Sequence, residues 1–381
     1  MSTGGRAEVA RPPGPSFGEA LWQSIWPVLV GVAIAMALHF ALPRIVSVFW
    51  IKIVMQIGLA MIFAVSLNIV NGMTGQFSIG HAGFIAIGGY TAGAITYYGS
   101  LLLWKETIRH GGFLGPGEWL FCGACLAGGL VAAGLGYLVG LPSLRLRGDY
   151  LAIVTLGFGE IVRVLLQQTN PTLRTWSELE SAGRAELFPP PVGGALGFSG
   201  IPKYLNLFWV CLWLAVTVIA AWRLKHSSLG RAMISVREDE IAARAMGVNV
   251  TRQKVWAFIL AAFFAGCGGG LYAHESGYIE PRDAGFQRSF EYVIMVVLGG
   301  SGSISGSMIA AAILTWLPEA LRNLQDYRLI VYALLLVVMM LVRPQGLLGF
   351  REVWELPWIA ALKNGLSGPR NGSSRDTGDR T

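Results

Sequence analysis

Apolar residues fill ten segments of this chain, and polar or basic connections separate them. A helix needs about 20 apolar residues to cross a bilayer, and most of these segments approach that length. The pattern predicts an all-α polytopic membrane helical bundle of about ten spans within residues 21–344. A flexible N-terminal extension, 1–20, and a C-terminal tail, 345–381, flank it. The predicted spans are 25–42, 50–70, 80–98, 120–141, 151–166, 205–224, 255–273, 292–300, 304–321 and 329–342.

Glycine and polar residues interrupt the pattern in two places, 71–89 (NGMTGQFSIGHAGFIAIGG) and 299–307 (GGSGSISGS). Irregular backbone at membrane depth is tolerated only inside protein or along a wet cavity. A pair of such segments in the two halves of a transporter points to its pathway. The neutral hydrogen-bonding groups here suit a zwitterion, although a lone histidine is more often a satisfied interior residue. The candidate pathway residues are Asn71, Gln76, Ser78, Gly80, His81, Gly83, Gly299 and Gly300.

Composition narrows the class of protein. Of 381 residues, 54% are hydrophobic and 13% are charged, about half the charged fraction of a soluble domain, which excludes a soluble enzyme. The net charge of +7 does not indicate nucleic-acid binding, because most basic residues sit in the connections. The four cysteines lie in apolar segments and behave as small hydrophobic residues rather than metal ligands.

The positions of the basic residues predict the topology. They concentrate in 143–149, which includes Arg145 and Arg147, in 223–254, and from Arg343 onward. By the positive-inside rule these segments are cytosolic. Ten spans then place both termini in the cytoplasm and the connection 167–204 outside, where it is a plausible docking surface.

Glu160 and Arg163 are the two charges inside a predicted span that most need explanation. Each costs about 2.5–3.5 kcal/mol near the bilayer centre. Their i, i+3 spacing places them on one helix face, where they can pair with each other or with neighbours. A structural ion pair and a role lining the pathway both remain open.

The cytosolic stretch 237–255, REDEIAARAMGVNVTRQKV, lies within a predicted coupling loop at about 226–254. Its acids favour a helix N-terminus, its alanines favour a helix, and a glycine ends it. Such a helix can fill a groove on a partner, or it can be a solvated connection. The candidate coupling residues are Glu238, Asp239, Glu240, Ala243 and Gly247.

Four segments resemble the permease subunits of branched-chain amino-acid ABC importers. They are LNIVNGMTGQFSIGHAGFIAIGGYTA from Leu67, LRLRGDYLAIVTLGFGEIVR from Leu144, the coupling stretch, and EYVIMVVLGGSGSISGS from Glu291. The resemblance implies a subunit of the cell inner membrane that works with a second homologous permease, two ABC ATPase subunits and a periplasmic substrate-binding protein. It implies transport of leucine, isoleucine or valine.

The chain is not expected to be an enzyme or to bind a cofactor itself. A phosphate-binding loop needs Gly-Lys followed by Ser or Thr, and none of the lysines here follows a glycine. ATP and Mg are therefore expected to act in the partner subunits, while this chain contacts the lipid bilayer. Alternatives are a permease for urea, amides or other small polar solutes, and a gradient-driven transporter that uses Glu160 and Arg163. The absence of further acids inside the predicted spans argues against the gradient-driven transporter.

Overall fold

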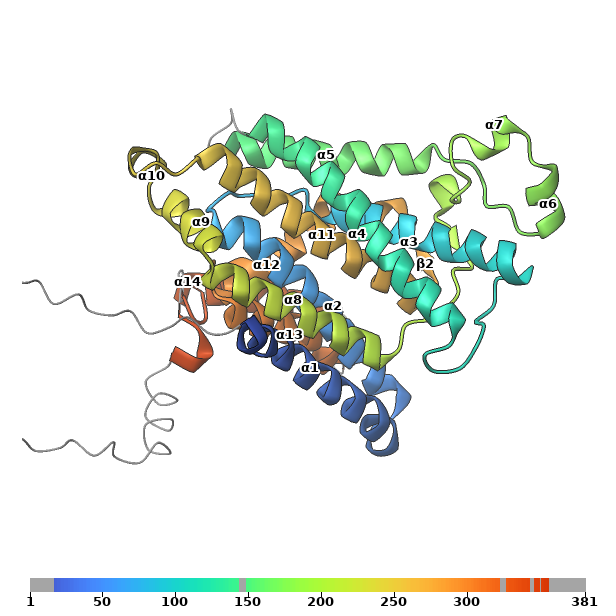
Figure 1. Cartoon of the computed structure of the whole chain (residues 1–381), viewed down its shortest axis with the longest axis horizontal. Helices are drawn as coiled ribbons and strands as arrows, with labels where there is room; N and C mark the ends of the chain where they lie inside the picture. Colours follow the sequence, from blue (N-terminus) through green and yellow to red (C-terminus); the bar gives the residue numbers. More distant parts are fainter. Residues whose placement is uncertain (1–16, 144–148, 323–326, 343–345, 350, 356–381) are drawn as a thin grey trace, which may run out of the picture.

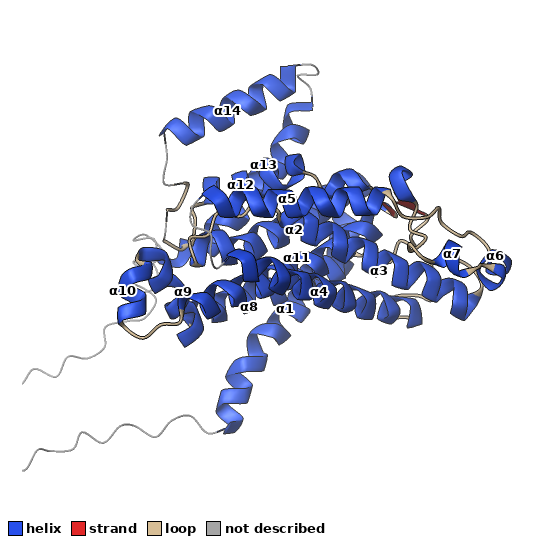
Figure 2. Ribbon diagram, turned by 90° about the horizontal axis from the view of Figure 1, so that it is seen from above, coloured by secondary structure: helices blue, strands red, loops and turns tan. Residues whose placement is uncertain are grey.

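A computed structural model describes residues 17–143, 149–322, 327–342, 346–349 and 351–355. Long helices run roughly side by side along the long axis of the molecule (Figure 1). The short helices α9 and α10 lie at one end, and α6 and α7 lie at the other (Figures 1 and 2). The helices are α1 (Phe17–Ile45), α2 (Val48–Asn68), α3 (His81–Trp104), α4 (Pro116–Ser143), α5 (Asp149–Gln167), α6 (Trp176–Ser181), α7 (Arg184–Leu187), α8 (Leu207–His226), α9 (Ser228–Glu238), α10 (Glu240–Ala245), α11 (Val250–Ser276), α12 (Phe286–Gly299), α13 (Ile304–Ala320) and α14 (Arg328–Val342).

The remaining elements are short. One π-helical turn, η1 (Ile69–Met73), continues α2. Two-residue strands β1 (Phe198–Ser199) and β2 (Tyr278–Ile279) pair antiparallel, with Phe198 opposite Ile279. The 3-10 turns are η2 (Gly194–Leu196), η3 (Pro281–Ala284) and η5 (Val353–Glu355).

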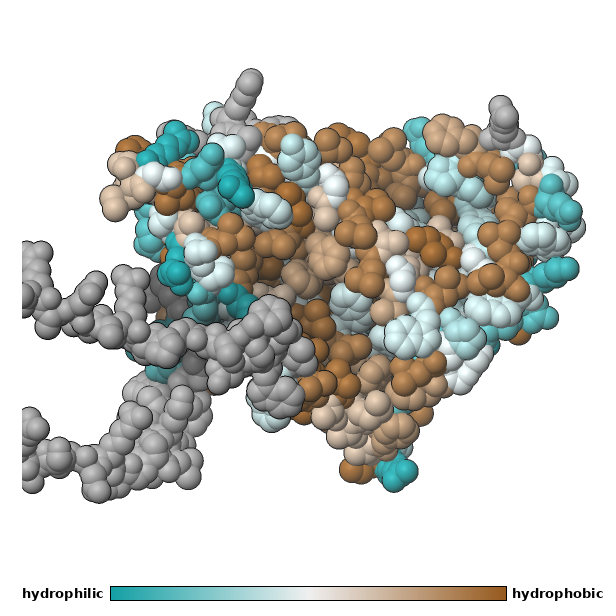
Figure 3. Space-filling view, in the orientation of Figure 1, coloured by the Kyte–Doolittle hydropathy of each residue, from teal (hydrophilic) through white to brown (hydrophobic). Residues whose placement is uncertain are grey.

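Every predicted apolar segment overlaps a helix, so the all-α fold class is confirmed. Six helical segments in the described part of the chain are long and apolar enough to cross a membrane, and the full count of ten spans is not confirmed. The six segments are Trp26–Ile45, Val48–Met73, Pro116–Leu141, Tyr150–Gln167, Leu207–His226 and Val250–Ser276. Hydrophobic surface covers the middle of the molecule, while hydrophilic residues gather at its two ends (Figure 3). This distribution is that of a multi-pass membrane protein.

Several predicted boundaries are wrong. The first helix begins at Phe17, inside the predicted flexible extension. The first interruption covers only residues 69–80, because 81–89 is regular helix in which the glycines meet neighbouring helices. The α12 helix begins at Phe286 rather than at residue 292. Arg145, Arg147 and most of the tail, 356–381, lie outside the described residues.

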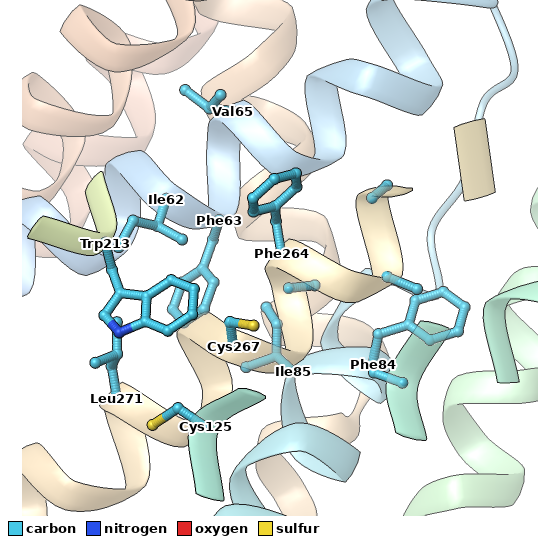
Figure 4. Close-up of a cluster of buried hydrophobic side chains, with 14 of the residues drawn as sticks. Ile62, Phe63, Val65, Phe84, Ile85, Cys125, Trp213, Phe264, Cys267 and Leu271 are labelled. Carbon is cyan, nitrogen blue, oxygen red and sulfur yellow. The ribbon is translucent and has the colours of Figure 1, made fainter. Parts of the chain in front are cut away.

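The core forms where α11 crosses α3 and α4 at close range. A Cβ on Gly266 of α11 would lie 2.8 Å from the carbonyl oxygen of Gly128, and a Cβ on Gly128 would lie 2.6 Å from that of Gly88. Glycines therefore set the separation of the three helices, as small residues do in membrane bundles. Larger side chains, including Phe84, Phe264 and Leu271, fill the space around this contact (Figure 4).

Two helices stand at the periphery. The span Trp26–Ile45 of α1 is only 6% buried, and α14 stands apart from the bundle in Figure 2. Ile330, Leu334 and Leu341 of α14 are more than half exposed. Apolar side chains exposed in this way are suited to contact with lipid or with another membrane chain.

We expect Gly128→Ala to destabilise the bundle, because the added methyl group meets the backbone of α3. Overpacking of this kind typically costs about 1–3 kcal/mol. The measurement is the thermal unfolding midpoint of the detergent-purified protein. Gly134→Ala is the matched control on the same helix, because nothing lies within 4 Å of its Cβ position. Equal midpoints for the two variants would contradict the close three-helix contact.

Candidate functional site

The first interruption is a turn that the chain's own side chains hold in place. After η1, residues 74–80 run without helical structure until α3 begins at His81. The Ser66 hydroxyl lies 2.9 Å from Nε2 of His81 and so joins the helices on either side. The backbone N–H of Ser78 donates to Oδ1 of Asn71 over 3.2 Å. These bonds satisfy part of the backbone and side-chain polarity that the broken helix leaves buried.

The two interrupted segments contact each other directly through Asn68. Its Nδ2 donates to the carbonyl oxygen of Ser303 over 3.1 Å, and its Oδ1 accepts from the N–H of Gly302 over 2.8 Å. Gly72 lies against the same point, since a Cβ there would collide with Asn68 and with the backbone of Gly302. One amide therefore joins segments more than 230 residues apart in sequence.

An ion pair between Glu352 and Lys225 also contacts the second interruption. Glu352 is 1% exposed, and its carboxylate accepts from the Lys225 ammonium over 2.5 Å. It also accepts from the N–H groups of Ile304 and Ser305, over 3.1 and 3.0 Å, at the N-terminus of α13. The helix dipole favours a negative charge at that position. Lys225 donates in addition to the carbonyl oxygen of Gly302 over 2.8 Å.

The predicted coupling helix is two helices. Glu238 is the last residue of α9, and Asp239 is the N-cap of α10, where Oδ1 accepts from Ile241 N over 2.7 Å and from Ala242 N over 3.0 Å. Those backbone donors lower the pKa of Asp239. The expectation of three acids in one first turn is wrong, because the capping aspartate needs an extended backbone and so separates the helices. Glu240 begins α10 and pairs with Lys254 of α11.

The end of α10 follows the sequence prediction. Gly247 has φ of +83°, in the left-handed region that glycine adopts readily, and it ends the helix as expected. Ala243 is buried against Val236 and Val250, whereas Ile241 is 74% exposed and Met246 is 84% exposed. The helix thus presents apolar side chains at the end of the molecule, away from the bundle.

Arg237 connects this end of the molecule to the first interruption. It stands in the last turn of α9, and its Nη1 donates to the carbonyl oxygen of Gly72 over 2.8 Å. Gly75, which has φ of +67°, packs against the same side chain, since a Cβ there would lie 2.7 Å from Cγ of Arg237. The α9 helix is therefore in direct contact with the interrupted segment.

The other candidate pathway residues divide into two groups by exposure. Gly80, Gly83, Gly299 and Gly300 are buried, as are the polar residues: Asn71 is 8% exposed, Gln76 5%, Ser78 2% and His81 2%. Glu160 and Arg163 are half-buried and pair with each other over 2.6 Å. Glu160 also accepts from the N–H of Phe286 over 3.3 Å, at the start of α12.

Two buried amides in the first interruption lack a partner for their NH2 groups among the described residues. These are Nδ2 of Asn71 and Nε2 of Gln76. An unsatisfied buried donor costs about 1–3 kcal/mol. The segment is therefore held in an arrangement that leaves part of its polarity unpaired. No group of three or more His, Cys, Asp or Glu residues that could hold a metal ion occurs in the parts of the chain that the structure describes.

Sequence reasoning missed Lys225, Arg237 and Glu352 as functional candidates. Lys225 and Arg237 were counted only as basic residues of a cytosolic connection, and Glu352 lay in a tail treated as uninformative. It also missed Glu291, an acid within α12, because the predicted span begins one residue later, at 292. The argument that no further acids lie inside the spans is therefore wrong. The available signal for Glu352 is the charged group Arg351, Glu352 and Glu355 among the apolar residues that follow the last predicted span.

Residues 49–342 match the protein family described as branched-chain amino acid transport system / permease component. The chain is similar to the high-affinity branched-chain amino acid transport system permease protein LivM of Escherichia coli, with 37% identity over 82% of this chain and 73% of that protein. It is 33% identical to LivM of Salmonella typhimurium over 88% of this chain and 78% of that protein. LivH of Escherichia coli is 33% identical over 42% of this chain and 53% of its own length. No solved structure gives a significant match.

The Glu352 ion pair predicts a defined pH dependence of stability. Burial raises the pKa of Glu352, but Lys225, the Ser305 hydroxyl and two backbone N–H groups outweigh it and hold the pKa below the ordinary 4.5. A lowered folded-state pKa stabilises the fold above pH 4.5 and stops doing so as the pH falls through the folded value. We expect Glu352→Gln to lose about 3–5 kcal/mol of stability at neutral pH. The difference from the parent should shrink below pH 4.5, as measured by thermal unfolding at a series of pH values.

Glu319→Gln is the control for this measurement, because Glu319 forms an exposed i, i+3 pair with Arg322. Exposed pairs contribute about 0–1 kcal/mol, so this variant should unfold close to the parent at every pH. A Glu352→Gln variant that also follows the parent throughout would show that the buried pair does not form.

Proposed function

Because the chain belongs to the family of branched-chain amino acid transport permeases, we propose that it is the membrane-spanning subunit of an ATP-driven importer of leucine, isoleucine or valine. In this proposal it pairs with a second homologous permease, and two ABC ATPase subunits supply the energy. A periplasmic binding protein delivers the amino acid to the face that carries α6 and α7. The extended similarity to the LivM proteins carries the proposal.

The chain crosses the inner membrane with both termini in the cytoplasm. Ten spans then comprise α1 to α5, α8 and α11 to α14, some of them shortened by the interruptions. The arrangement of the described helices supports this topology, because α9 and α10 lie at the opposite end from α6 and α7 (Figure 1). The basic connection 223–254 is thereby cytosolic.

The ATPases act on the bundle through α9 and α10. The exposed apolar side chains Ile241 and Met246 enter a groove on an ATPase subunit, as a short amphipathic helix can. Motion of α9 then reaches the first interruption through Arg237 and the second through Lys225, at the end of α8. Coupling needs contacts that differ between the inward-open and outward-open states. The NH2 groups of Asn71 and Gln76, which are unpaired in the arrangement that the structure describes, form hydrogen bonds in the other of these two states.

The experiment is to purify the tagged chain from its native membrane in mild detergent, identify its partners by mass spectrometry, and measure uptake of labelled leucine in vesicles. Two ATPases, a second permease and ATP-dependent uptake are expected. Uptake of urea or an amide in place of leucine would support the assignment as an importer but change its proposed substrate. Purification of the chain alone, with uptake that collapses when the ion gradient is removed, would favour the gradient-driven transporter.

We expect Met246→Asp to weaken the ATPase attachment, because it places a charge in an apolar contact. Co-purification of the ATPase subunits should fall at least about fivefold, corresponding to a loss of about 1 kcal/mol or more at a buried contact residue. Leu196→Asp is the matched control, since Leu196 is 87% exposed in the connection 167–204, on the side that carries α6 and α7. Unchanged ATPase recovery with Met246→Asp would contradict this assignment of α10.

A further inference from the structure

Five charged side chains lie together where α5, η3 and α12 meet, and we call them the charged strip. Glu160 and Arg163 pair on α5. Arg288 on α12 lies 3.2 Å from Glu291 and 3.5 Å from Asp283, measured between nitrogen and oxygen. The bond from Phe286 N to Glu160 brings the two groups next to each other.

The charged strip lies away from the end of the bundle that carries α9 and α10. Glu160 is eleven residues beyond Asp149, about 16 Å along a helix. The 14-residue α12 is about 21 Å long, so its first turn is equally far from its end near Lys225. The hydrocarbon core of a bilayer is about 30 Å thick. Both measures place the charged strip close to the middle of the membrane.

These side chains are nevertheless exposed. The exposed fractions are 32–35% for the Glu160 and Arg163 side chains and 42–47% for those of Arg288 and Glu291. A charge facing lipid at this depth costs about 2.5–3.5 kcal/mol. The part of the surface that carries these charges therefore does not contact lipid, and water or another protein must cover it.

The arginines retain hydrogen-bonding capacity for a solute molecule. Arg163 donates to Glu160 through Nε, and Arg288 donates to Glu291 through Nη1. A guanidinium has five N–H donors in a planar fork that matches a carboxylate. Both arginines therefore have N–H groups left over, and the carboxylates Glu160 and Glu291 can accept from an ammonium group.

We propose that the charged strip lines a water-filled passage between this chain and the second permease, and that it holds the carboxylate and the ammonium group of an amino acid in transit. The proposal rests on the proposed function for the partner subunit and the cargo. Water in the passage removes the cost of the exposed charges. The internal ion pairs keep the binding weak, because a visiting amino acid must displace them in part.

The first experiment measures whether this face is wet in the assembled complex. Gln287→Cys places a thiol on the exposed first turn of α12, and a membrane-impermeant, negatively charged methanethiosulfonate reports its reaction through the mass of the protein. Thiols react as thiolates, which form in water and not in lipid. We expect Gln287→Cys to react at least about tenfold faster than the lipid-facing control. Leucine with the binding protein and ATP should slow the reaction.

Leu130→Cys is that control, because Leu130 is 65% exposed in the middle of α4. The parent complex measures the background from Cys122, Cys125, Cys211 and Cys267. Equally slow reaction at both sites would overturn the proposal and show a dry contact with the partner subunit. If Gln287→Cys reacts fast but the parent complex takes up no leucine, the result would support the passage and overturn the amino-acid cargo.

The second experiment measures the role of the charge. Arg163→Gln should lower leucine uptake at least about tenfold, a loss of about 1.4 kcal/mol in transport efficiency. Arg163→Lys keeps the positive charge and should restore part of the uptake. Equal uptake by Arg163→Gln and the parent would overturn the assignment of Arg163 to the passage. The comparison is made at equal amounts of assembled complex, so that loss of folding is separated from loss of transport.

Discussion

The constraint behind this structure is that a helix interrupted inside a membrane must find partners for its backbone within the protein. Where lipid or protein surrounds such a segment, each unsatisfied N–H or C=O group costs several kcal/mol. Asn68 meets this requirement where the two interruptions are in contact, because its side-chain amide both donates to Ser303 and accepts from Gly302. The two interruptions satisfy each other, and neither can move alone without leaving buried polar groups unpaired.

This mutual dependence explains why the contacts at the α9 end matter for the whole bundle. Arg237 holds the first interruption at Gly72, and Lys225 holds the second at Gly302. Both basic residues come from α8 and α9, which are joined by a single residue, Ser227. Lys225 then neutralises Glu352, which would otherwise be a buried, unpaired charge. A push on α9 is thereby shared between the two interruptions.

The sequence predicted the helices well and the contacts between them poorly. Apolar runs located each of the long helices, because burial in lipid or protein demands apolar side chains over the whole length. The positions of the two interruptions followed from glycine and polar residues in the same way. The extent of the first interruption was predicted wrongly, because Gly83 and Gly88 lie in a regular helix and serve helix packing. Composition alone does not distinguish a packing glycine from a turn glycine. Pairings such as Asn68 with Gly302, across more than 230 residues, depend on the fold and leave no local pattern.

The same limit applies to the polar residues and shows which of them can meet a cargo. Asn71, Gln76, Ser78 and His81 looked suitable because they are neutral and lie in an interruption, but they are buried and pair largely within the chain. Glu160 and Arg163 looked costly, yet their side chains are 35% and 32% exposed. Buried amides that lack partners suit a segment that changes its arrangement, whereas exposed charges suit a face that water reaches. In the proposed mechanism, the interruptions therefore act as the moving parts of the bundle, and the charged strip acts as its contact with the solute.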